Sequence, residues 1–314
     1  MSNILSISFL VSLLASMVRL ATPILLPALG QVYTQRSGIL NLGVEGTMLI
    51  GAVCGFTTTC VSGNLWLGIL IGTISGAVYS VLMAWLSVTM KSNQVIAGIG
   101  MNILAAGLAA FIYRLVFGIR SLPPQVVPFQ DINIPLLSEI PIIGKVFFQH
   151  NIMVYISYVL IVPLSWFILE KTTFGLKIRA VGENPRAADS KGINVGLIRY
   201  SSIIIGGAYA GMGGVFMTIA YMNTFTEKII GGFGFIAVSV VIFARFMPIR
   251  TVFGALLFGV AQALQLRLQA QGIGIPVQFL LMLPYILTII ALIIASKRAD
   301  FPSAYTIPYS RMER

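Results

Sequence analysis

Long apolar runs without charge, separated by short polar or basic segments, make up most of the chain. The stretch between Glu45 and Lys91 holds no charged residue, and Ser62-Gly63-Asn64 supplies a turn near its middle. Because a membrane-spanning helix needs about 20 apolar residues, this stretch predicts two spans. The whole pattern predicts about nine spanning helices, within a range of eight to ten, with further runs at residues 1–35, 93–113, 152–169, 201–222, 233–244, 251–266 and 277–296.

The first apolar run has an irregular second half. Pro23, Pro27 and Gly30 interrupt it, and the polar, glycine-rich stretch at residues 36–46 follows. Irregular backbone at membrane depth is tolerated where it is buried in protein or lines a cavity. The pattern therefore predicts a broken or re-entrant segment near residues 22–45.

Glycines recur at helical spacing in two of the predicted spans. They are Gly68, Gly72 and Gly76 in one span, and Gly207, Gly211 and Gly214 in another. Small residues at this spacing let helix backbones approach closely in lipid, so they predict helix–helix contacts and indicate nothing about cargo.

Composition supports the same fold class. Of the 314 residues, 57% are hydrophobic and only 9% are charged, with a mean hydropathy of +0.94. A soluble domain carries about a quarter charged residues, so a soluble enzyme is excluded. The sequence predicts an all-α polytopic membrane protein, with residues 1–314 forming a single transmembrane domain.

The net charge of +11 is explained by basic loops on one side of the membrane. Six Lys or Arg residues lie in the loop at 170–200, and four lie in the tail at 297–314, whereas the loop at 117–150 has two that are offset by Asp131 and Glu139. The first two segments are therefore predicted to be cytoplasmic, and the third external. Nine spans then place the N-terminus outside. No basic stripe with interleaved aromatics indicates a nucleic-acid partner.

A short helix is predicted near residues 184–192 in the cytoplasmic loop. Asn184 suits the N-cap, Pro185 suits the first helical position, and Gly192 is a natural stop. Such a helix is either a solvated loop element or a docking element that inserts into a groove on a partner protein.

Several polar residues fall within or beside apolar runs. Glu45 is a functional-site hypothesis by default, because an acid inside a membrane is costly. Its structural alternative is an ion pair with Arg36 or Arg19. Uncharged amides either hold helices together or line a path for a neutral, hydroxyl-rich cargo. The candidate path residues are Asn41, Glu45, Asn93, Gln94, Asn102 and Phe233.

Familiar catalytic and nucleotide-binding motifs are missing from the sequence. Gly144-Lys145 is followed by Val146 and lacks the earlier glycine of a phosphate-binding loop. His150 is the only histidine, which argues against multi-histidine metal sites and hydrolytic triads. We therefore expect a transport subunit that is no enzyme and binds no metal or cofactor itself.

With these residues in view, the chain resembles the permease subunits of bacterial ABC importers for nucleosides and simple sugars, within the wider branched-chain amino acid and ribose permease superfamily. The resemblance covers residues 20–296. Gln35, where the family often has Glu, and Phe246-Met247 depart from the pattern. The similar stretches are residues 21–38 with Asn41-Leu42-Gly43-Val44-Glu45-Gly46, residues 173–185 with Ala187-Ala188, and residues 232–238 with Pro248.

The resemblance implies several partners and a location. An ATPase subunit that carries ATP-Mg would dock on the cytoplasmic face, a second permease (a paralogue or an identical copy) would pair with this one, and an external binding protein would deliver cargo. The assembly would lie in the bacterial cytoplasmic (inner) membrane. Residues 184–192 would be the coupling helix, with contacts at Arg179, Glu183, Asn184, Pro185, Arg186, Ala187 and Ala188.

The resemblance favours nucleosides as cargo, followed by simple sugars and then riboflavin-like molecules, with branched-chain amino acids a poorer fit. Three alternatives from other classes remain open at this point. They are a transporter or channel driven by an ion gradient, a membrane enzyme and a structural scaffold. Dependence on ATP separates the gradient-driven alternative from the ABC permease.

Overall fold

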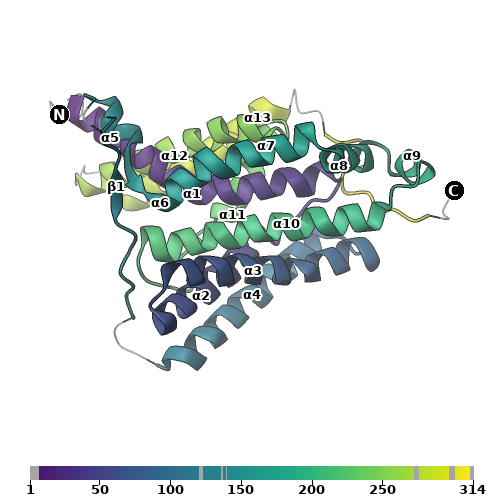
Figure 1. Cartoon of the computed structure of the whole chain (residues 1–314), viewed down its shortest axis with the longest axis horizontal. Helices are drawn as coiled ribbons and strands as arrows, with labels where there is room; N and C mark the ends of the chain where they lie inside the picture. The colour runs from purple at the N-terminus through teal and green to yellow at the C-terminus, as the bar shows by residue number, and fades with distance from the viewer. Residues whose placement is uncertain are drawn as a thin grey trace.

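The structure is a computed structural model that describes residues 7–119, 123–135, 137–138, 140–271, 276–296 and 301–311. These residues form a bundle of helices with one small antiparallel hairpin (Figure 1), so the predicted all-α class is confirmed. In the hairpin, β1 (Asp131–Asn133) pairs with β2 (Gln149–Asn151), and Ile132 lies opposite His150. The helices are α1 (Ile7–Arg36), α2 (Val44–Ser62), α3 (Leu65–Ala84), α4 (Gln94–Phe117), α5 (Ile143–Phe147), α6 (Ile152–Tyr155), α7 (Val162–Lys171), α8 (Thr173–Glu183), α9 (Pro185–Ser190), α10 (Val195–Val215), α11 (Phe233–Phe243), α12 (Pro248–Ala270) and α13 (Val277–Ser296).

The described helices account for the predicted number of spans. Seven are long and apolar enough to cross a membrane, and two shorter apolar helices, Phe233–Phe243 and Val277–Ile290, accompany them. Single π-helical segments continue three of the long spans, at Trp85–Thr89 after α3, Ile156–Ile161 between α6 and α7, and Phe216–Tyr221 after α10. The predicted count of about nine thus corresponds to these seven spans together with α11 and α13.

The first helix differs from its prediction. α1 runs unbroken through Pro23 and Pro27, and the chain leaves the helix only at residues 37–43. Every side chain from Leu20 to Gln35 is buried, because α10, α11 and α12 pack around this helix. Neighbouring helices let a spanning helix tolerate proline. The break near residues 22–45 is therefore confined to the polar stretch before α2.

The two glycine series lie where α2, α3 and α10 meet. A Cβ atom built on Gly211 would lie 2.5 Å from the Gly72 carbonyl oxygen, and one built on Gly76 would lie 2.5 Å from the Gly207 carbonyl oxygen. Real Cβ atoms do not approach backbone so closely. The prediction that these glycines bring helix backbones together is confirmed.

We expect Gly211→Val to destabilise the folded bundle. The added methyl groups have no space between three backbones, and such overpacking costs about 1–3 kcal/mol or more. The melting temperature of the purified protein should fall clearly. Gly100→Val in α4 is the matched control, since a Cβ at Gly100 meets no atom within 4 Å. Equal melting temperatures for the two variants would contradict the close-packing account.

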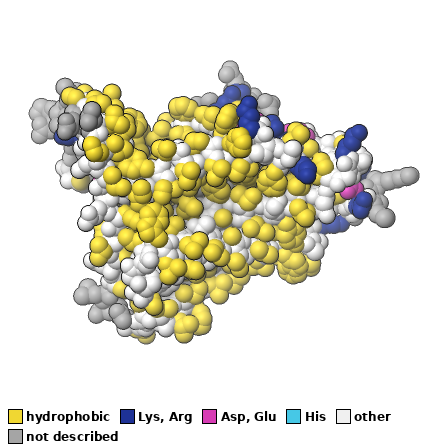
Figure 2. All heavy atoms as spheres, viewed as in Figure 1, with side chains coloured by type: hydrophobic (Ala, Val, Ile, Leu, Met, Phe, Trp, Pro, Cys, Tyr) yellow, Lys and Arg dark blue, Asp and Glu magenta, His cyan; other side chains and the backbone are white. Residues whose placement is uncertain are grey.

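Charged side chains gather at the end of the bundle that carries α8 and α9, while apolar side chains cover much of the rest of the face shown in Figure 2. The described chain begins at the opposite end, and residues 301–311 lie beside α8 and α9 (Figure 1). This arrangement agrees with an odd number of crossings between the two ends.

The loop at 170–200 contains more helix than the sequence predicted. Besides α9 it forms α8, whose N-cap is Thr172, with its Oγ1 accepting from the Gly175 N–H at 3.2 Å. Asn184 has extended backbone angles, so it ends α8 and begins α9. α9 stops at Ser190, two residues before the predicted limit at Gly192, which adopts a φ of +79°.

Candidate functional site

Two helices begin inside the bundle and their N-termini meet. α2 begins at Val44 after the irregular residues 37–43, and α11 begins at Phe233 after the irregular residues 222–232. α11 has 11 residues and so rises about 16 Å, roughly half the thickness of the hydrocarbon core. Helix N-termini within the membrane are typical of transporter binding sites. The N-termini of α2 and α11 are together called the helix junction below.

Glu45 joins the two halves of the helix junction. Its Oε1 accepts from the Gly232 N–H at 2.7 Å, and its Oε2 accepts from the Gly234 N–H at 2.7 Å. The carboxylate therefore caps α11, where the helix dipole favours negative charge. Gly232 has a φ of +90°, which glycine adopts without strain.

The ion-pair alternative for Glu45 is wrong. Arg36 Nη1 lies 2.7 Å from Glu170 Oε1, and Arg19 Nη2 lies 3.0 Å from Asp131 Oδ2. Both arginines are thus paired with other acids. The acid expected inside the membrane bonds to backbone N–H groups instead, which the sequence could not indicate because the partners are 187 and 189 residues away.

Amide side chains satisfy the backbone of the break before α2. Asn102 lies on α4, where its Oδ1 accepts from the Gly46 N–H at 2.8 Å and its Nδ2 donates to the Leu42 carbonyl at 3.0 Å. Gln94 Oε1 accepts from the Leu40 N–H at 2.8 Å, and Asn41 Oδ1 accepts from the Gly43 N–H at 2.9 Å. α4 therefore holds the break in shape.

The remaining two candidates differ in position. Phe233 is the first residue of α11 and packs against two separate clusters of buried hydrophobic residues. Asn93 is exposed and caps α4, with its Oδ1 accepting from the Val95 N–H at 3.0 Å. The structure thus brings Asn41, Glu45, Gln94, Asn102 and Phe233 together and leaves Asn93 at the start of α4.

Among the candidate residues brought together here, one polar atom is buried without a partner in the described part of the chain. Gln94 is buried, and its Nε2 has no hydrogen-bond partner among the described atoms. The other amide and carboxylate oxygens named above are used by backbone N–H groups. In this conformation the junction is therefore mainly a latch that holds α2, α4 and α11 together.

The predicted coupling residues fall into three groups. Asn184 caps α9, with Oδ1 accepting from the Ala187 N–H at 3.0 Å, and Pro185 is its first residue. Arg186 and Ala187 are exposed, whereas Ala188 is buried. The outward face of α9 is therefore smaller than the sequence suggested.

The other two coupling candidates bind groups within this chain. Arg179 Nη1 lies 3.0 Å from Glu170 Oε2. Glu183 Oε2 accepts from the Ser303 hydroxyl at 2.9 Å. Both side chains thus connect α8 to neighbouring elements of the same chain.

Residues 301–311 tie the coupling helices to the break before α2, which the sequence did not indicate. The Ala304 N–H donates to the Gly182 carbonyl at 2.9 Å, and the Thr306 N–H donates to the Gly38 carbonyl at 2.9 Å. Arg199, buried in α10, donates to the Ile307 carbonyl at 3.0 Å. Residues 297–300 and 312–314 of the predicted tail lie outside the described residues.

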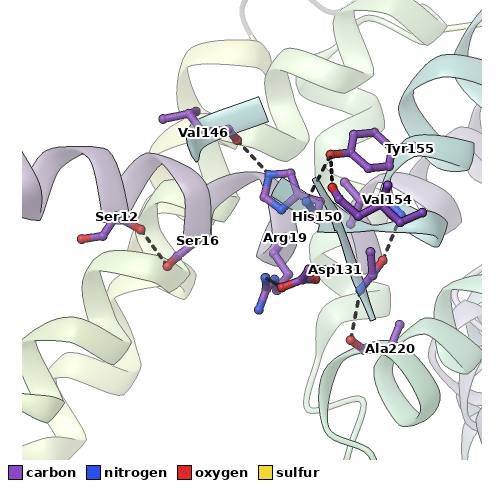
Figure 3. A network of polar contacts seen from close by, with 11 residues as sticks. Ser12, Ser16, Arg19, Asp131, Val146, His150, Val154, Tyr155 and Ala220 are labelled. Atoms are coloured by element: carbon purple, nitrogen blue, oxygen red, sulfur yellow. Dashed lines mark hydrogen bonds and ion pairs between the residues drawn. The ribbon is translucent and has the colours of Figure 1, made fainter. Parts of the chain in front are cut away.

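A polar network closes the opposite end of the bundle (Figure 3). The hairpin brings Asp131 to Arg19, and His150 Nε2 donates to the Val146 carbonyl at 2.8 Å. Burial lowers the pKa of His150, which favours the neutral form of the ring. Asn151 caps α6 and donates from Nδ2 to the Ala220 carbonyl at 3.2 Å.

A cavity of about 430 Å³ lies beside this network, between α1 and α12. Its polar lining includes Arg19, His150, Tyr221 and Arg267. Arg267 was not among the residues predicted for a site, although an arginine within an apolar span was a usable signal. Glu139 and Arg120, from the predicted external loop, lie outside the described residues.

A profile of the family described as "Branched-chain amino acid transport system / permease component" matches residues 13–292. The chain belongs to this family. Relatives include the guanosine ABC transporter permease protein NupQ of Bacillus subtilis, 39% identical over 94% of this chain and 95% of the relative. The putative glucose ABC transporter permease protein TsgC13 of Haloferax volcanii is 39% identical over 85% of this chain and 81% of the relative. The nucleoside ABC transporter permease protein NupC of Lactococcus lactis is 36% identical over 95% of this chain and 96% of the relative. No solved structure matches.

The permease is thus a multi-pass transport subunit of an ABC transporter, and it is not the catalytic component. Membership implies an ATPase partner, which carries the nucleotide, and a substrate-binding protein. Among the residues that the structure describes, no three His, Cys, Asp or Glu side chains cluster as metal ligands would.

Proposed function

We propose that this permease forms half of a translocation path for nucleosides, with a simple sugar as the second candidate. The observation that carries the proposal is similarity over nearly the full length to permeases named for guanosine and for nucleosides. The sugar alternative is favoured by the equal identity to a relative named for glucose, over a smaller share of both chains.

The chemistry of the helix junction supports a neutral cargo. Asn41, Gln94 and Asn102 supply uncharged amides, and the single acid, Glu45, is engaged by two backbone N–H groups. A nucleoside or a sugar offers hydroxyl groups to such amides. An ion-driven transporter needs ionisable relays in its spans. The two acids of the described spans are already engaged, Glu45 by backbone N–H groups and Glu170 by two arginines.

In this proposal the helix junction is the gate of the path. The bonds from Asn102 and Glu45 join α4, α2 and α11. When ATP binding closes the ATPase, movement of α8 and α9 would pass to the junction through residues 301–311 and the carbonyl of Gly38. Opening the latch would free the engaged amide groups of Asn41 and Asn102 and would expose the unpaired Gln94 Nε2 to the cargo.

The proposed arrangement has the ATPase on the outward face of α9, within the cytoplasmic segment 170–200, and the tail 297–314 on the same side. The binding protein would approach the external loop 117–150. A second permease, either a paralogue or another copy, would complete the path in the cytoplasmic (inner) membrane of a bacterium, and residues 1–314 would act as a single transmembrane domain.

Uptake into proteoliposomes that hold the complete transporter tests the cargo. We expect ATP-driven uptake of radiolabelled guanosine, competed by other nucleosides and not by glucose. The controls are the same proteoliposomes without ATP and liposomes that lack this permease. Uptake of glucose alone would replace the nucleoside proposal by the sugar one, and guanosine uptake that persists without ATP would refute both.

A further inference from the structure

Four arginines surround a cavity of about 440 Å³ at the end of the bundle that carries α8. Arg36 is the last residue of α1 and Arg179 lies within α8, whereas Arg245 lies in the turn between α11 and α12 and Arg250 lies in the first turn of α12. Glu183 is the single acid in the lining. The cavity plays no part in the helix junction or in the outward face of α9.

The positive charge around this cavity is only partly neutralised. Glu170 binds both Arg36, at 2.7 Å, and Arg179, at 3.0 Å. Arg245 and Arg250 are exposed and form no ion pair with any described acid. Arg179 Nε is buried without an acceptor in the described part of the chain. Four guanidinium groups thus face two carboxylates, those of Glu170 and Glu183, and the Nε–H of Arg179 still lacks an acceptor.

The turn that carries Arg245 is fixed in an unusual conformation. Arg245 and Phe246 have φ angles of +50° and +57°, which residues other than glycine seldom adopt. The Phe246 ring is buried, with its centroid 5.6 Å from the Phe301 ring and 6.2 Å from the Tyr305 ring. Packing against the C-terminal segment therefore holds Arg245 at the rim of the cavity.

The cavity opens toward an apolar surface. A neighbouring cavity shares Arg250 and Met247 with it and is lined by Trp166 and Ile249. Ile249 is 48% exposed, and Phe253, one turn further along α12, is 66% exposed. Lys171 Nζ lies 5.5 Å from the centroid of the Trp166 ring. Tryptophan and lysine at the end of a span are typical of the membrane–water boundary.

We propose that this cavity binds the phosphate of an anionic phospholipid, whose acyl chains lie along Ile249 and Phe253. Basic pockets between spanning helices are suited to anionic headgroups. A guanidinium also matches the geometry of phosphate oxygens better than an ammonium does. An acidic segment of the ATPase would satisfy the charges but would leave the adjoining apolar surface to other molecules. A phospholipid would satisfy the charges with its phosphate and cover the apolar surface with its acyl chains. Its headgroup would also link the α11–α12 turn to α8.

Native mass spectrometry of the purified permease tests the site directly. The probes are dioleoylphosphatidylglycerol, which is anionic, and dioleoylphosphatidylcholine, which is not. Because each basic residue contributes about 1 kcal/mol to attraction of anionic lipid, we expect the double variant Arg245→Gln, Arg250→Gln to lose the preference for phosphatidylglycerol by about tenfold or more. The single variant Arg250→Gln should lose part of it.

The matched control is Lys177→Gln with Lys191→Gln, which removes the same charge from exposed residues outside the cavity. Both double variants should melt as the parent protein does. Equal loss in the control, or equal retention of the two lipids by the parent, would overturn the proposal. Complete displacement by millimolar inorganic phosphate would assign the site to a soluble anion. Loss of the lipid on assembly with the ATPase would assign it to the ATPase.

Discussion

Replacing Glu45 by glutamine should reduce transport at least tenfold and lower the melting temperature of the permease. The carboxylate accepts two hydrogen bonds of 2.7 Å from the start of α11. Glutamine keeps one acceptor and turns an NH₂ group toward a backbone N–H. An unsatisfied buried N–H costs about 1–3 kcal/mol, and each 1.4 kcal/mol is a factor of ten. Uptake by the reconstituted transporter and thermal melting would measure the two effects.

Glu227→Gln is the matched control for this substitution, because Glu227 is exposed and lies 3.5 Å from the exposed Arg114. A Glu45→Gln protein that melts like the parent but does not transport would show that the carboxylate acts on cargo rather than as a cap. A variant with full stability and full uptake would contradict both roles and the proposed latch.

Rearranging the charges on the exposed face of α9 should separate transport from folding. Arg186 and Ala187 are exposed, so the double variant Arg186→Glu, Ala187→Arg changes the surface offered to the ATPase and leaves the packing of Ala188 intact. We expect ATP-driven uptake to fall by about tenfold or more. Surface substitutions usually change stability by less than about 0.5 kcal/mol, so melting should hardly change.

The control for α9 is Lys228→Glu, a charge reversal at an exposed residue near the other end of the bundle. Uptake within twofold of the parent for the α9 variant would remove these side chains from the coupling role. Glu183 suits this test less well, because it also accepts a hydrogen bond from Ser303. Its substitution would therefore disturb the attachment of the C-terminal segment as well as any contact with the ATPase.

Much of the fold could be predicted from periodicity and charge. The charge-free runs located the seven long spans and the two further apolar helices, and the glycine spacing predicted the contact among α2, α3 and α10. Asn184 and Pro185 predicted where α9 begins, because capping is a local property of sequence. The same local rules failed at Pro23 and Pro27, where packing against α10 and α12 keeps α1 helical.

The partners of the candidate site residues could not be predicted. Gln94 and Asn102 are eight residues apart, so a shared face of α4 was foreseeable, but their bonds to Leu40 and Gly46 depend on how α4 docks. The cap that Glu45 provides to α11 and the attachment of residues 301–311 also join segments distant in sequence. Hydropathy carries no information about such contacts.

ATP hydrolysis by the complete transporter in liposomes, measured with and without cargo, tests the central claim most directly. The assembly should contain this permease, its ATPase, its partner permease and the binding protein. We predict that guanosine loaded on the binding protein stimulates hydrolysis and that the Arg186→Glu, Ala187→Arg variant loses this stimulation. Cargo transport through the permease with no ATPase present, or stimulation unaffected by the α9 variant, would contradict the account.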